Sequence, residues 1–122
     1  MIGKKVIIRA DRAGVFFGTL KEKVGIDVTL TDCRRLWYWL GAATIWQLAV
    51  EGTVRPNECK FTLVVPIIAI LGVIEIIPCT DKAAKSIEDV AVWKNRERYS
   101  LILALAMAMA LALAMALALA MA

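Results

Sequence analysis

Five residues near the middle of the chain have side chains suited to binding chemistry. Four of them stand in the string "RRLWYWL", as Arg34, Arg35, Trp37 and Trp39. Arginine forms paired hydrogen bonds with phosphate oxygens, and an exposed aromatic ring stacks on nucleic-acid bases. We therefore expect this segment to offer a surface for single-stranded DNA or RNA. The alternative is that Trp37 and Trp39 belong to a hydrophobic core, with the arginines in solvent or paired with nearby aspartates.

The fifth residue, Trp46, lies in the string "TIWQLAVEGT", whose pattern is typical of a helix. Thr44 and Gln47 have the spacing of a capping box, which satisfies free N–H groups at a helix start. Trp46 comes one position after the core-facing Ile45, so its ring need not share the core face. An outward Trp46 would mark a surface for a protein partner. In the alternative interpretation, Trp46 covers the mouth of a small barrel.

Other residue types argue against catalysis. The chain has no histidine, which is the commonest general base and a frequent metal ligand. The three cysteines, Cys33, Cys59 and Cys79, form no CxxC pair, and their odd number argues against a disulfide framework, so we expect buried thiols in a reducing cytoplasm. The acidic residues are scattered and the glycines match no phosphate-binding loop. We predict no catalytic residue, no metal site, no cofactor and no small-molecule substrate, and therefore no enzyme.

The elements that would position these residues follow from hydrophobic periodicity and turn signals. Alternation of apolar and polar residues predicts a series of short strands, and capping residues predict two helices. The expected strands cover residues 4–10, 15–23, 26–32, 33–40, 59–65, 67–78 and 90–93, with helices over 44–51 and 80–88. Gly18 inside the second strand predicts a bend or bulge. We also expect a turn near Asp32, between the third and fourth strands.

Short sequential strands with hairpin turns favour a mainly β, α+β domain over residues 1–94. Its expected form is a small curved antiparallel sheet or an SH3/Sm-like barrel with one inserted helix, because curling protects the sheet edges. A charged linker over residues 95–100 and an apolar, low-complexity Leu/Met-Ala helix over residues 101–122 complete the expected organisation. The net charge of +4 is mildly basic and favours weak attraction to polyanions.

Three strings carry a family resemblance: "AGVFFGTL", "RRLWYWLGAATIWQLAVEGT" and "VIEIIPCTDKAAKSIEDVAVW". With them, residues 5–94 resemble a family of small uncharacterised proteins of tailed phages and prophages, a domain of unknown function. The resemblance implies phage origin, and the host cytoplasm or the virion as location. It implies no catalytic residues.

The C-terminal segment 101–122 has three interpretations. In the first it is a membrane anchor, because 22 residues rise about 33 Å as a helix, enough for a hydrocarbon core of about 30 Å. Lys94, Arg96 and Arg98 would then flank it on the cytoplasmic side of the inner membrane. In the second it is a buried or oligomeric helix. However, Ala at every even position from Ala104 has period 2, which gives no helical stripe.

In the third interpretation the repeat belongs to the DNA. Leu-Ala and Met-Ala codons of the form YTG-GCN or ATG-GCN, read in a shifted frame, give glycine alternating with Ser, Ala, Asp, Asn or Tyr. Such a tail would be flexible and soluble. The nucleotide sequence tests this, since Leu and Ala codons that do not align in this way exclude a frame shift.

Together these observations predict a non-enzymatic phage accessory or virion-associated module that works by binding. The expected partner is a protein or a second copy of the chain. The first alternative is a small β-barrel that binds nucleic acid. The second is a tail-anchored membrane protein of phage origin, attached through residues 101–122.

Overall fold

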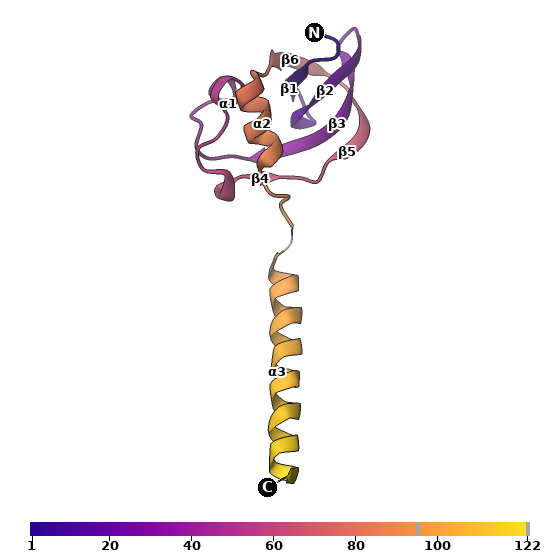
Figure 1. Cartoon of the computed structure of the whole chain (residues 1–122). Helices are drawn as coiled ribbons and strands as arrows, with labels where there is room; N and C mark the ends of the chain where they lie inside the picture. Colours follow the sequence, from indigo (N-terminus) through magenta and orange to yellow (C-terminus); the bar gives the residue numbers. More distant parts are fainter. Residues whose placement is uncertain (95, 122) are drawn as a thin grey trace.

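The structure, a computed structural model, describes residues 1–94 and 96–121, with side chains in the second range described from Ile102 onward. Most of the helices and strands lie in one domain, and a long C-terminal helix follows it (Figure 1). The elements are β1 (Lys5–Ala10), β2 (Gly14–Val24), β3 (Asp27–Tyr38), α1 (Ile45–Glu51), the 3-10 turn η1 (Pro56–Glu58), β4 (Lys60–Phe61), β5 (Val65–Ile70), β6 (Val73–Pro78), α2 (Asp81–Asp89) and α3 (Arg96–Met121).

The strands form one six-stranded sheet in the order β4-β3-β2-β1-β6, and all of its pairs are antiparallel. β5 lies on the same side of β3 as β4, pairing with the first half of that strand while β4 pairs with its end. The predicted α+β class, with a mainly β domain and an apolar C-terminal helix, is confirmed.

The link between β5 and β6 explains why the sheet curls. The two strands lie at opposite edges of the sheet, yet only Leu71 and Gly72 join them. The three Cα–Cα steps from Ile70 to Val73 reach at most about 11 Å, so the edges must come together at this corner. Gly72 has φ +73°, a conformation that other residues rarely adopt. β5 and β6 are not paired with each other, so the sheet does not close. Of the two predicted forms, a curved sheet or a barrel, the structure has the curved open sheet.

The bend within the sheet lies at Gly18 and Asp32. The β2–β3 register shifts between Phe17 and Thr19, which confirms the irregularity predicted at Gly18. A Cβ on Gly18 would lie 3.1 Å from the carbonyl oxygen of Thr31, so a larger residue would require the β3 backbone to shift slightly. The predicted turn near Asp32 is wrong. Asp32 has φ +49° and bends one continuous strand, β3, instead of separating two.

Three other expected boundaries differ from the structure. The strand predicted over 67–78 divides at Gly72, because its left-handed backbone interrupts the extended chain. Pro66 lies inside β5 and does not end a strand, which an edge strand tolerates because its outer side needs no hydrogen bond. Of the strand predicted over 59–65, only Lys60–Phe61 pairs before β5 begins, and the strand predicted over 90–93 is a single bridge between Val92 and Phe61.

Within the charged segment predicted as a linker over 95–100, residues 96–100 form the first turns of α3, and residue 95 lies outside the described residues.

The helix boundaries follow the capping residues closely. The Thr44 side chain accepts a hydrogen bond from the Gln47 backbone N–H at 3.0 Å, and the Thr80 side chain caps α2 through Ala83 N–H at 3.1 Å. Gly52, at φ +76°, ends α1 with its N–H bonded to the Leu48 carbonyl. These caps satisfy N–H and C=O groups that the helix itself leaves free.

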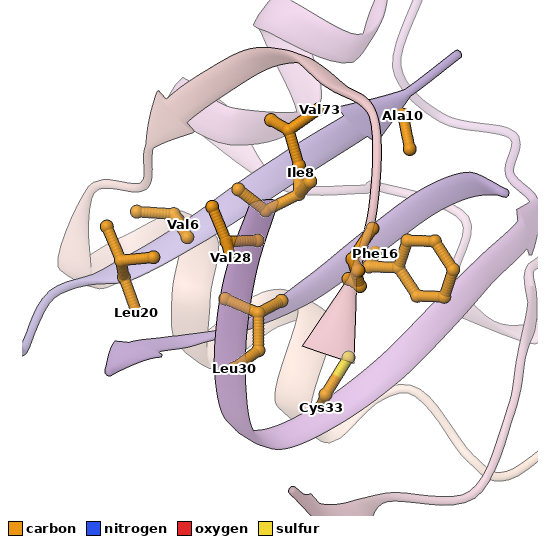
Figure 2. Close-up of a cluster of buried hydrophobic side chains, with 10 residues drawn as sticks. Val6, Ile8, Ala10, Phe16, Leu20, Val28, Leu30, Cys33 and Val73 are labelled. Carbon is orange, nitrogen blue, oxygen red and sulfur yellow. The ribbon is translucent and has the colours of Figure 1, made fainter. Parts of the chain in front are cut away.

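Two hydrophobic clusters hold the domain together, one on each face of the sheet. The first lies inside the curl and receives side chains from five strands; Figure 2 shows it with Val6, Ile8, Phe16, Leu30 and Val73 among its members. The second lies on the other face, where α1 and α2 cover it. Its buried members are Ile7, Phe17, Leu36, Leu48, Ala49, Cys59, Phe61, Ala84, Ile87 and Val90.

β1 is the strand shared by both clusters, because successive side chains of a strand point to opposite faces. Val6 and Ile8 enter the first cluster and Ile7 enters the second, and all three are fully buried. By contrast, Ile102–Ala120 of α3 has no buried residue, and the helix stands apart from the domain (Figure 1).

We predict that a fragment of residues 1–94 folds without α3. The buried members of both clusters lie between Val6 and Val90, so removing α3 takes away no core side chain. The fragment should unfold in one cooperative thermal transition by circular dichroism and give dispersed amide signals in NMR spectra. Sharp, poorly dispersed signals with no cooperative transition would contradict this assignment.

Candidate functional site

Arg34 is the only charged residue among the buried side chains of the described residues, with 3% of its surface exposed. It lies on β3 and points into the face covered by α2. Its Nε donates to the Thr62 carbonyl at 2.9 Å and its Nη2 to the Phe61 carbonyl at 3.2 Å. Its Nη1 donates to the carbonyls of Ile87 at 3.0 Å and Val90 at 2.8 Å. Four carbonyl oxygens from two separate segments therefore converge on one guanidinium.

This arrangement stabilises a positive charge that burial disfavours. Desolvation lowers the pKa of Arg34, but Ile87 and Val90 lie at the C-terminal end of α2, where free carbonyls carry partial negative charge. The Phe61 ring adds a contact 5.5 Å from Cζ to its centroid. The hydrogen bonds of Arg34 thus hold the end of α2 and the β4 segment against β3. Because its donors point inward, Arg34 shares no surface with the other residues predicted to bind.

Arg35 and Trp37 lie close together at the surface. The Arg35 Cζ lies 4.3 Å from the centroid of the Trp37 ring, and Trp37 is 55% exposed. Gly14, at φ +109°, makes room for this guanidinium, since a Cβ there would lie 3.0 Å from Arg35 Nη2. The exposure of Trp37 contradicts the alternative that placed its ring in a core, whereas Arg35 is half-buried. The binding role of Arg35 and Trp37 stays a prediction.

A second group of aromatic and basic side chains lies at the end of β3. Lys60 Nζ lies 5.6 Å from the centroid of the Tyr38 ring and 5.6 Å from that of Trp93, so the ammonium sits between two rings. Tyr38 is 44% exposed and Trp93 is 46% exposed. We call Tyr38, Lys60 and Trp93 the basal surface; Trp37, next to Tyr38 on β3, points to the other face of the strand. Lys60 reaches Tyr38 through the short β3–β4 pairing, and Trp93 follows the bridge between Val92 and Phe61. Such short pairings between distant segments leave no periodic signal, so the sequence did not predict Lys60 and Trp93 as part of a site.

Trp39 and Trp46 do not belong to the basal surface. Trp39 is partly buried and packs against the second cluster, since β3 ends at Tyr38 and the alternation ends with it. Trp46 is 60% exposed on α1, and its Nε1 donates to Glu75 Oε2 at 3.1 Å. Glu75 lies on β6, which is separated from β3 by β1 and β2. The five residues predicted to bind therefore divide among an interior contact, two separate surfaces and a core.

The cysteines lie in surroundings that suppress thiol chemistry. Cys33 and Cys59 are buried, and Cys79 is partly buried. Burial raises the pKa of Cys33 and of Cys79 from 9.0 to about 12 each, because a thiolate loses hydration there. Over residues 1–94 and 96–121, no three His, Cys, Asp or Glu side chains gather closely enough to hold a metal ion.

We predict that Arg34→Met destabilises the domain by roughly 3 kcal/mol or more, because four carbonyls lose their shared donor. Urea unfolding of the 1–94 fragment measures this change. The matched control is Arg35→Met, which removes a half-buried cation that stacks on Trp37 at the neighbouring position and should cost at most about 1 kcal/mol. Equal effects of the two substitutions would show that the buried contacts of Arg34 contribute little.

We predict that the native thiols resist modification by a disulfide reagent at about pH 8, since the thiolate is the reactive form. With pKa values of about 12, Cys33 and Cys79 hold far less thiolate than unfolded cysteines. Their neutral thiols favour the folded state below pH 9.0, and this contribution is lost as the pH rises toward about 12. All three cysteines should react in denaturant. Native reaction at the rate of free cysteine would reveal an activated thiol.

A comparison with protein-family models matches residues 3–87 to Domain of unknown function (DUF6948). The match covers β1 through most of α2 and stops before α3. In a search of curated proteins, none matches the chain.

Proposed function

Since the chain belongs to the DUF6948 family, we propose that residues 1–94 form a non-enzymatic binding module of phage or prophage origin, which α3 holds at a membrane. The phage origin rests on the three strings of the resemblance. The family match ends at residue 87, so the membrane helix is an addition to the family domain. The module would act in the host cell, on the cytoplasmic face of its inner membrane.

The observation that carries this proposal is the exposure of α3. Among the described residues, one helix is long and apolar enough to cross a membrane, and its stretch Ile102–Ala120 has no buried residue. Nineteen residues rise about 28 Å, close to the hydrocarbon thickness of about 30 Å. A helix that is apolar all round is unfavourable in water, and its backbone groups are already satisfied within the helix. A bilayer is therefore a more favourable environment than water for α3.

The expected free energy of membrane insertion supports the placement of α3 in a bilayer. Residues 101–122 contain seven Leu and one Ile, and at about −0.5 kcal/mol each they favour insertion by roughly 4 kcal/mol. Lys94, Arg96 and Arg98 precede this stretch in the sequence. The positive-inside rule places such residues, and the domain before them, on the cytoplasmic side.

We predict that the full chain stays with membranes after carbonate extraction, and that the double substitution Leu111→Arg/Leu113→Arg releases it. Each arginine at the helix centre costs about 2.5–3.5 kcal/mol, so two of them exceed the favourable sum. The matched control, Leu111→Met/Leu113→Met, should remain in the membrane fraction. A parent chain that is recovered in the carbonate supernatant would refute the proposal.

A further inference from the structure

The basal surface lies where the domain meets its membrane helix. Trp93 N–H donates to the Phe61 carbonyl at 2.8 Å, and Val92 bridges to Phe61 beside it. These contacts fix the end of the domain against β4, only three positions before α3 begins at Arg96. Figure 1 shows β4 at the end of the domain from which the chain continues to α3. The aromatic rings of the basal surface therefore lie next to the start of the helix.

We propose that the basal surface contacts the headgroups of an anionic bilayer beside α3; this inference rests on the proposed membrane attachment. Tryptophan and tyrosine suit the membrane interface because each combines an apolar ring with one polar group. Lys60 presents an ammonium between two such rings, where anionic headgroups attract it. Leu63 and Val64, which follow β4 in the chain, are also exposed.

The length of α3 outside the apolar stretch sets how deep this surface reaches. From Arg96 to Ile102 the helix rises about 9 Å. The polar layer on each side of a bilayer is about 5–8 Å thick. With Ile102 at the hydrocarbon boundary, the base of the domain stands at the outer side of the headgroups. The basal surface thus touches headgroups and does not enter the hydrocarbon.

The same residue types would also stack on single-stranded nucleic acid, but the arrangement favours lipid. A groove for nucleic acid needs cations that follow the phosphate backbone of the strand. Arg34 is buried and cannot provide one of them. The cations close to the exposed rings are Arg35 over Trp37, and Lys60 between Tyr38 and Trp93.

The test uses the full chain in phosphatidylcholine vesicles with or without about one third phosphatidylglycerol, an anionic lipid. A lipid carrying a spin label on its headgroup quenches nearby tryptophan fluorescence. The quenched fraction should fall at least threefold in Trp93→Phe. The matched control is Trp46→Phe, which removes an exposed tryptophan on α1 and should leave the quenched signal unchanged.

A charge reversal tests the electrostatic part. Lys60→Glu should abolish the increase in quenching that phosphatidylglycerol produces. The control is Lys23→Glu on β2. Lys23 pairs with Val28, near the opposite end of β3 from Tyr38, so this change should have no effect. Equal responses of the two variants would overturn the role of Lys60.

The outcomes separate the two proposals. If carbonate extraction removes the chain from the vesicles, both fail. If the chain resists extraction but Trp93 is not quenched, α3 inserts and the headgroup contact is refuted. Salt-sensitive quenching by single-stranded oligothymidylate that disappears in Trp93→Phe would assign the surface to nucleic acid and overturn the inference.

Discussion

The buried guanidinium of Arg34 is the interaction on which the arrangement of this domain depends. One planar group satisfies carbonyls of β4, of the residue after it and of the end of α2. α2 packs on the sheet through Ala84 and Ile87, but Arg34 fixes where the helix stops. That end point directs the chain to Val92, which bridges to Phe61. The position of Trp93, and of the start of α3, follows from this charge in the interior.

Little of this arrangement around Arg34 and Trp93 could be predicted from the sequence. Arginine is rarely buried, and the partners of Arg34 are backbone carbonyls that have no sequence signature. Lys60 and Trp93 were missed for a related reason: short pairings between distant segments bring them to Tyr38. Pairwise long-range contacts of this kind are set by tertiary packing, which local patterns do not encode.

Local chemistry was more informative. Thr44 and Thr80 cap the helices that their spacing predicted, and Gly18 marks an irregularity in the sheet. The turn predicted near Asp32 was wrong because a polar residue after an alternating run usually indicates a turn. Here the positive φ of Asp32 bends a strand that continues. The division at Gly72 was missed because the Ile and Val residues on either side favour an extended chain throughout. Residue type thus indicated where the backbone changes direction, but not by how much.

The two-sided burial of β1 has a consequence for the order of events during synthesis. β2 and β3 follow β1 closely, so one side of its ladder can form early. The pairing on the other side of β1 cannot form until β6 has been synthesised, because Val6 pairs with Pro78, about 70 positions later in the chain. Until that segment leaves the ribosome, the nascent chain exposes an open strand edge rich in valine and isoleucine. The chain is therefore most exposed to misassociation, and most in need of a chaperone, just before its last strand emerges.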